Sequence, residues 1–135
     1  MTLSGGCYCG AIRYEAAGPL FNSTLCHCAD CRRVTGAPAV GWFSVAHASL
    51  RYTRGAPREF QSSPKVRRAF CADCGTTLTW RHTDMPQEID IATCSLDDPD
   101  AVPPQDHSYV ASAVRWLHLA DDLPLYPRSR SEGPG

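Results

Sequence analysis

The chain has 135 residues and a formal net charge of -1, so it fits one domain and offers no global attraction for nucleic acid or an anionic membrane surface. No stretch approaches the length of a membrane span, and residues 1–10 contain neither a basic nor an apolar run, so we expect a cytoplasmic protein. Because cytoplasmic thiols stay reduced, its eight cysteines favour metal thiolates over a disulfide framework.

Short runs rich in β-branched and aromatic residues alternate with turn-forming residues, a pattern typical of an antiparallel β protein. Strands are predicted at 11–16, 21–25, 40–45, 50–53, 58–61, 65–70, 76–81, 88–94 and 108–114. Short helical turns are predicted at 29–34 and at 97–101, where Pro99 suits a first turn. We therefore expect one mainly β domain over 1–127 with few short helices. A disordered tail should follow over 128–135, because few apolar residues come after Tyr126.

Most of the cysteines fall into three groups along the chain. They are Cys7 with Cys9, then Cys26, Cys28 and Cys31, then Cys71 with Cys74. A structural zinc takes four protein ligands, whereas a catalytic zinc commonly takes three and keeps one position open. The two pairs are therefore predicted to share a structural zinc. The triplet is predicted to hold a second, catalytic zinc with one open position.

The spacing within each pair favours metal binding. In Cys71-Ala-Asp-Cys74-Gly75, two sulfurs can meet one ion across a tight turn, and Gly75 can then adopt the left-handed backbone conformation. Cys7 and Cys9 are two positions apart, so we expect both side chains to leave the same face of an extended strand. A shared ion would tie the N-terminal strand to the middle of the chain.

The fourth position of the triplet has two candidate protein ligands. By strand alternation, His27 points away from Cys26 and Cys28, which indicates a packing or surface role. Cys94 lies in an alternating apolar run, where a free cysteine usually behaves as a small buried hydrophobe. If Cys94 were a ligand instead, the open position would be closed.

Charged residues follow the triplet closely. Arg32 and Arg33 are able to offset a three-thiolate site or hold a substrate carboxylate, and the alternative is that they are solvated. Asp30 is able to move a proton, although an exposed turn aspartate is the commoner case. Clustered cysteines also bind iron–sulfur clusters, but turns this short are more typical of zinc.

Three ordered motifs carry a resemblance to a known family. They are Gly5-Gly6-Cys7-Tyr8-Cys9-Gly10 with Ile12-Arg13-Tyr14-Glu15, Cys26-His27-Cys28-Ala29-Asp30-Cys31-Arg32-Arg33 with Gly36-Ala37, and Phe70-Cys71-Ala72-Asp73-Cys74-Gly75-Thr76. In this order the chain resembles the glutathione-dependent formaldehyde-activating enzyme family, which also includes centromere protein V. The resemblance continues through Leu96-Asp97-Asp98-Pro99 to Trp116. Cys94 departs from it, because a small residue such as glycine is expected there.

The resemblance implies a β-tent fold with a structural zinc at the positions matching Cys7, Cys9, Cys71 and Cys74. It implies a catalytic zinc at Cys26, Cys28 and Cys31. It also implies a carbon–sulfur lyase activity, in which glutathione adds to formaldehyde to give S-hydroxymethylglutathione. The expected partners are therefore a small thiol and a small aldehyde, with no nucleic acid and no membrane.

Two function classes follow from the sequence. In an enzyme, a thiol at the open position of the triplet zinc would lose its proton and attack a carbonyl carbon. In the alternative, both ions only staple a small, non-enzymatic β module that binds a protein partner. A basic patch on such a module would draw on Arg51, Arg54, Arg58, Lys65, Arg67 and Arg68. On alternating strands, however, such residues more often mark a solvated face.

Overall fold

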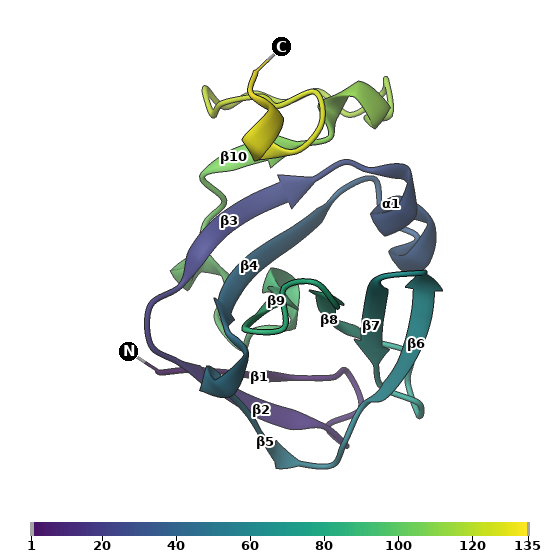
Figure 1. Cartoon of the computed structure of the whole chain (residues 1–135), viewed down its shortest axis with the longest axis vertical. Helices are drawn as coiled ribbons and strands as arrows, with labels where there is room; N and C mark the ends of the chain where they lie inside the picture. The colour runs from purple at the N-terminus through teal and green to yellow at the C-terminus, as the bar shows by residue number, and fades with distance from the viewer. Residues whose placement is uncertain (1, 135) are drawn as a thin grey trace.

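The computed structural model describes residues 2–134, so Met1 and Gly135, which begin the expected domain and end the expected tail, lie outside them. Figure 1 shows a mainly β molecule built from two sheets, which confirms the predicted fold class. None of its helices has the length and apolar character needed to cross a bilayer, within the residues described.

The smaller sheet has the strand order β1-β2-β5 and is antiparallel throughout. Its strands are β1 (Thr2–Gly6), β2 (Arg13–Ala17) and β5 (Leu50–Arg54). The larger sheet has the order β10-β3-β4-β9-β8-β7-β6. Its strands are β3 (Phe21–Cys26), β4 (Val40–Ala46), β6 (Arg58–Ser63), β7 (Val66–Phe70), β8 (Thr77–His82), β9 (Glu88–Ala92) and β10 (Asp106–Ser108). β10 pairs with β3 in parallel, and the other neighbouring strands pair antiparallel.

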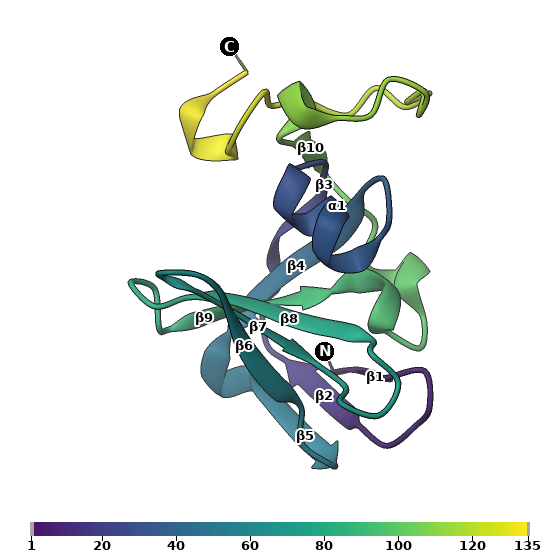
Figure 2. The same ribbon diagram turned by 90° about the vertical axis from the view of Figure 1, so that its right-hand side faces the viewer.

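The main apolar core lies between the two sheets. Tyr14 of β2 packs there with Phe43 of β4, Leu78 of β8 and Ile91 of β9, all of them almost fully buried. The other face of β4, β9 and β8 does not contact this core, because side chains alternate across a strand. That second face is therefore available to line a site, and Figure 2 shows it turned toward the C-terminal segment.

The helical turns are short, as expected. α1 (Ala29–Thr35) ends at Gly36, whose φ of 73° stops the helix in the left-handed conformation. The remaining turns are 3₁₀ helices: η1 (His47–Ser49), η2 (Thr93–Ser95), η3 (Pro99–Ala101), η4 (Val110–Ser112) and η5 (Arg130–Glu132). The helical predictions at 29–34 and 97–101 correspond to α1 and η3.

Three details of the strand prediction are wrong. β1 was missed because its sequence, Thr2–Gly6, carries no apolar alternation. Its Gly5 is needed for close packing, since a Cβ there would lie 2.5 Å from the Tyr14 hydroxyl. The strand predicted at 88–94 ends at Ala92 and continues as η2. The strand predicted at 108–114 is instead β10 followed by η4, because Tyr109 adopts a left-handed backbone conformation with φ 57°.

The segment expected to be disordered makes specific contacts over its described residues, 128–134. Arg130 donates to the Asp106 carboxylate at 2.6 Å and to the Asn22 side-chain oxygen at 2.8 Å. Tyr109 donates its backbone N–H to the Arg128 carbonyl at 3.0 Å. The disorder expected over 128–135 stays a prediction, and hydrogen exchange of this segment is its direct test.

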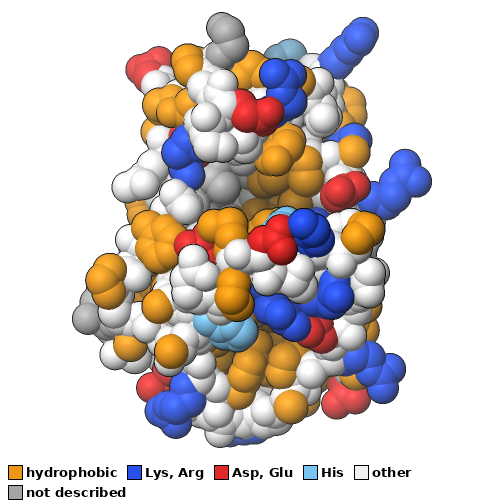
Figure 3. Space-filling view, in the orientation of Figure 1, with side chains coloured by type: hydrophobic (Ala, Val, Ile, Leu, Met, Phe, Trp, Pro, Cys, Tyr) orange, Lys and Arg blue, Asp and Glu red, His pale blue; other side chains and the backbone are white. Residues whose placement is uncertain are grey.

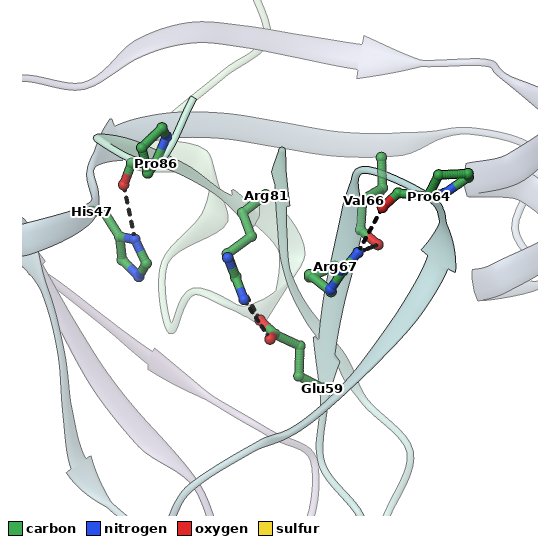
Figure 4. Close-up of polar contacts among 7 residues, drawn as sticks. All are labelled: His47, Glu59, Pro64, Val66, Arg67, Arg81 and Pro86. Atoms are coloured by element: carbon green, nitrogen blue, oxygen red, sulfur yellow. Dashed lines mark hydrogen bonds and ion pairs between the residues drawn. The ribbon is translucent and has the colours of Figure 1, made fainter. Parts of the chain in front are cut away.

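Most residues of the proposed basic patch have individual partners. Arg51 pairs with Glu15, Lys65 with Asp84, and Arg54 donates to the Gly10 carbonyl. Figure 4 shows Arg67 directed at the carbonyls of Pro64 and Val66, beside the two-bond pair of Arg81 with Glu59. Arg68 is 3% exposed and lies on a different face of the sheet. The individual partners agree with a solvated face rather than a patch, and Arg68 is the exception because it is buried on the other face.

Candidate metal centres and their cavity

Cys7, Cys9, Cys71 and Cys74 come together although 62 positions separate the second from the third. Their four Sγ atoms all lie within 4.8 Å of one another, with Cys7 to Cys9 at 3.6 Å and Cys9 to Cys71 at 3.8 Å. Zn–S bonds of about 2.3 Å place the sulfurs of a regular tetrahedron about 3.8 Å apart. The four sulfurs therefore fit a zinc ion.

Two similar turns present these sulfurs. The Gly75 N–H donates to the Cys71 carbonyl at 2.8 Å, and the Gly10 N–H donates to the Cys7 carbonyl at 3.2 Å. Both glycines have a left-handed backbone, with φ of 83° and 82°. The expectation that Cys7 and Cys9 leave one face of a strand is thus wrong, because β1 ends at Gly6 and a turn follows.

Thr76 links the two turns and was not identified from the sequence. Its hydroxyl lies 3.3 Å from the Cys74 Sγ and accepts the Tyr8 backbone N–H at 3.0 Å. This hydroxyl is the main reason that the pKa of Cys74 is lowered to about 5. The Ile12 N–H donates to the Cys7 Sγ at 3.2 Å. Donors aimed at sulfur favour the thiolate, which is the form that binds metal.

The second group consists of Cys26, Cys28 and Cys31, whose Sγ atoms also lie within 4.8 Å of one another. Cys26 is the last residue of β3, Cys28 caps the N-terminus of α1, and Cys31 lies in the first turn of that helix. The Cys31 N–H donates to the Cys28 Sγ at 3.2 Å. Contacts with the Cys26 and Cys31 sulfurs lower the pKa of Cys28 to about 2. The group therefore already favours an anionic sulfur.

Arg68 of β7 is the cation beside this triplet. Its Nη1 and Nη2 atoms each lie 3.8 Å from the Cys31 Sγ, and its Nε donates to the Ser62 hydroxyl at 3.1 Å. The sequence placed Arg68 on a solvated face or in a surface patch, and the compensating charge was expected at Arg32 and Arg33. Those two residues instead line a separate pocket of about 290 Å³ beside Trp116.

His27 is buried and connects the triplet to the C-terminal part of the chain. Its Nε2 lies 3.0 Å from His107 Nδ1, and His107 Nε2 lies 3.0 Å from both carboxylate oxygens of Asp121. Since Nε2 of His107 faces a carboxylate, it carries the proton, and His27 Nε2 is then the donor to His107 Nδ1. This agrees with the packing role expected for His27.

Cys94 takes part in neither group of the described cysteines. It is exposed on η2 rather than buried in a strand, so the expectation of a small buried hydrophobe is wrong. Because η2 turns the chain away from the β9 ladder after Ala92, strand alternation no longer applies at Cys94. No protein ligand for the fourth position of the triplet comes from Cys94.

A cavity of about 680 Å³ opens beside the triplet. Its lining includes all three cysteines, Asp30, Arg68 and the second face of the large sheet. Residues 108–109 and 129–131 of the C-terminal part form another wall. In Figure 2 this part lies above β8 and β9 of the large sheet. Figure 3, which has the orientation of Figure 1, shows the surface hollowed below the C-terminal segment.

Tyr109 is a second site residue that the sequence did not indicate. It lines the cavity from the turn after β10, in a left-handed conformation that is uncommon for a residue other than glycine. Burial raises its pKa, and the nearby sulfurs of Cys26 and Cys28 raise it further. The phenol therefore keeps its proton at neutral pH. The only sequence signal was its position within the strand predicted at 108–114.

Comparison with known proteins relates the chain to one enzyme family. The family model described as glutathione-dependent formaldehyde-activating enzyme matches residues 2–112. An uncharacterized lyase of Schizosaccharomyces pombe is 30% identical over 80 residues, which cover 59% of this chain and 58% of that protein. A Halomonas elongata protein, provisionally named a glutathione-dependent formaldehyde-activating enzyme, is 22% identical over 88% of this chain and 82% of its own length.

A solved structure has a similar fold. The crystal structure of a Rhodobacter sphaeroides protein superposes with a TM-score of 0.58 and 26% sequence identity. The match covers 73% of this chain and 94% of that one.

Proposed function

Because the chain belongs to the glutathione-dependent formaldehyde-activating enzyme family, we propose that it joins a thiol such as glutathione to a small aldehyde such as formaldehyde. The observation that carries the proposal is the cavity of about 680 Å³, whose wall contains Cys26, Cys28 and Cys31. This is a carbon–sulfur lyase reaction written in the direction of synthesis. The product is a hemithioacetal, S-hydroxymethylglutathione in the case of glutathione.

The two cysteine groups have different roles in this proposal. Cys7, Cys9, Cys71 and Cys74 would hold a structural zinc with four sulfurs. Cys26, Cys28 and Cys31 would hold a catalytic zinc, whose charge favours the thiolate over the thiol form of a substrate. We thus propose two zinc ions with different roles. The short distances between the sulfurs within each group support this proposal.

Side chains of the cavity would prepare the substrates. Arg68 offsets negative charge at the Cys31 sulfur, from 3.8 Å. Trp42 and Trp80 form apolar walls that exclude water from the reacting atoms. The protonated Tyr109 phenol, which lines the same cavity, would donate to the oxygen on which negative charge develops. In the balanced reaction, one S–C bond forms, the carbonyl π bond breaks, and the thiol proton ends on the carbonyl oxygen.

The alternative of a non-enzymatic, zinc-stapled module that binds a protein partner finds less support. A purely structural zinc needs no cavity beside its ligands, yet one is present. The basic residues of the proposed patch instead form separate pairs with acidic residues, such as Arg51 with Glu15 and Lys65 with Asp84. A closed site with four protein sulfurs should resist exchange with added thiol, whereas a three-sulfur site should take up the thiol.

The experiment compares hemithioacetal formation by zinc-loaded wild type, Cys28→Ser and Cys94→Ser, with glutathione and formaldehyde. Cys94→Ser is the matched control, because this cysteine is exposed and outside both groups. We expect the rate above the uncatalysed reaction to be lost in Cys28→Ser and kept in Cys94→Ser. Equal rates in the two variants would remove the proposed function for this substrate pair.

A further inference from the structure

One row of side chains crosses the cavity wall from strand to strand. Ser44 of β4 pairs with Asp90 of β9, Asp90 with Trp80 of β8, and Trp80 with Arg68 of β7. Residues directly opposite in a sheet share a face, so all four point to the same side. Each of them lines the cavity together with the cysteine triplet. The row therefore places a carboxylate and an indole on the same wall as the candidate reaction site.

The charged groups of this cavity are not balanced. Its lining holds two cations, Arg68 and Arg130, and three carboxylates, Asp30, Glu88 and Asp90. Arg130 is bonded to Asp106 and Asn22. Arg68 is directed at the Cys31 sulfur and at Ser62. Within residues 2–134, none of the ion pairs involves Asp30, Glu88 or Asp90. The cavity thus has unpaired negative charge and little free positive charge.

Asp90 and Glu88 lie on the same face of β9, two positions apart. Asp90 accepts one hydrogen bond, from the Ser44 hydroxyl at 2.6 Å. Burial raises the pKa of Asp90 to about 6, and the neighbouring Glu88 carboxylate adds to this shift. A cation bound between the two carboxylates would relieve their repulsion.

The two tryptophans of the cavity wall also favour a cationic group. Trp42 and Trp80 both line the cavity, and both pack in the cluster that contains Cys26 and Cys31. An ammonium group is attracted to the face of an indole ring, most strongly where water is excluded. A carboxylate would meet instead two aromatic faces and three like charges. The chemistry of the wall therefore discriminates between charged groups on a substrate.

We propose that this cavity selects thiols that carry an ammonium group close to the sulfur, with Asp90 and Glu88 as the specificity-determining carboxylates and the two tryptophans as walls. The inference rests on the proposed thiol–aldehyde function and names its substrate class. Glutathione carries one ammonium group and two carboxylates. Its ammonium group shares a carbon with one carboxylate and lies many bonds from the sulfur, so this cavity should prefer a thiol such as 2-aminoethanethiol to glutathione.

The test uses three small thiols of similar size: 2-aminoethanethiol, 2-mercaptoethanol and 3-mercaptopropionate. Calorimetric titration of the zinc-loaded protein gives the Kd of each one. The measured quantity is the Kd of 3-mercaptopropionate divided by that of 2-aminoethanethiol. These thiols differ in intrinsic acidity, and that difference cancels when the quotient is compared between wild type and variant at one pH.

The informative variants are Asp90→Asn and Glu88→Gln. An asparagine at position 90 keeps an oxygen that accepts from Ser44, and Glu88→Gln is the second variant if the first does not fold. Asp100→Asn is the matched control, because Asp100 is an exposed carboxylate outside the cavity lining. We expect the quotient to fall about tenfold in each cavity variant and to stay constant in the control. A quotient unchanged by both cavity variants overturns the inference.

A second measurement separates this failure from failure of the proposed function. Propylammonium and propionate, which have no sulfur, are titrated against the tryptophan fluorescence of the same protein. If none of the thiols binds but propylammonium binds in preference to propionate, the proposed function fails and the ammonium site stands. If the thiols bind and propionate is preferred, the ammonium site fails and the proposed function stands.

Discussion

At the scale of single residues, the candidate catalytic site includes side chains that lie outside the cysteine motifs. The cysteine triplet was evident from its spacing, but Arg68 and Tyr109 reach it from positions 37 and 78 residues beyond Cys31, in β7 and after β10. Nothing in the local sequence distinguishes Arg68 from the half-buried Arg67 beside it. Only the register of β7 against β8 and β6 determines which of Arg67 and Arg68 turns toward the cavity.

Replacing Arg68 with methionine should weaken metal binding at the triplet. The substitution keeps much of the buried stem and removes the charge beside the Cys31 sulfur. Because partners of metal ligands are typically worth about 10- to 100-fold in affinity, we expect a loss of that size. Cobalt titration, read from the sulfur-to-cobalt charge-transfer band, measures it. Arg67→Met is the control, and an equal effect of the two variants would contradict the assigned role.

Replacing Tyr109 with phenylalanine should slow the thiol–aldehyde reaction without changing metal content. The variant keeps the ring and removes the hydroxyl that would donate to the developing oxyanion. We expect the turnover number to fall by about 100-fold, the lower range for a positioned proton donor. The control is Tyr8→Phe, since Tyr8 is 93% exposed. Unchanged turnover in the Tyr109 variant would remove the donor role.

Asp90 should give the folding stability a distinct pH dependence. Its pKa is raised from 3.8 to about 6 by burial, with Ser44, Glu88 and Arg130 as the groups that act on it. The folded state therefore holds this proton more tightly than the unfolded state does. The resulting stability is complete below the unfolded value and is lost as the pH rises through 6.

Asp90→Asn removes this ionisation, so its stability relative to wild type should increase between about pH 4 and pH 7, by at most about 3 kcal/mol. Urea unfolding of both proteins across this range, at fixed zinc, measures the difference. Asp100→Asn serves as the control. A difference that does not change with pH would show that Asp90 ionises in the folded protein as it does in water.

At the scale of the elements, sequence patterns located most strands and the turn at Cys71–Gly75, but neither the turn after Cys7 nor the parallel pairing of β10 with β3. The β-branched runs gave β3 to β9 within a few residues, because these strands are bounded by turn-forming residues. β1 carries little such signal, since close packing on Tyr14 requires its glycine. β10 was misplaced because the parallel pairing with β3, an interaction across more than 80 positions, decides where the chain is extended.

The turn Cys71–Gly75 gives a prediction at this scale. Gly75 has a φ of 83°, and a Cβ there would have no atom within 4 Å, so Gly75→Ala causes backbone strain alone. We expect the free energy of unfolding to fall by about 1 to 2 kcal/mol. Urea unfolding of the zinc-loaded protein measures this. Asp73→Ala, an exposed change in the same turn, should have little effect, and a Gly75 variant as stable as this control would contradict the turn geometry.

At the scale of the whole molecule, one cysteine group connects the two sheets and the other supports the cavity. Cys7 and Cys9 follow β1 of the small sheet, and Cys71 and Cys74 lie between β7 and β8 of the large sheet. The triplet sits where β3 meets α1, and the C-terminal part closes the cavity above it. Ligand counting predicted this partition from the sequence. The cavity was not predictable, because its walls come from segments distant in the chain.

The central claim is that two zinc ions bind and that only the one at the triplet accepts an external ligand. The most direct test is an anomalous-scattering map at the zinc edge, from crystals of the zinc-loaded protein soaked with glutathione. We predict two zinc peaks, one within the sulfurs of Cys7, Cys9, Cys71 and Cys74. The second should lie beside Cys26, Cys28 and Cys31, with the glutathione sulfur as its fourth ligand. A triplet without zinc, or a protein atom in that fourth position, would contradict the account.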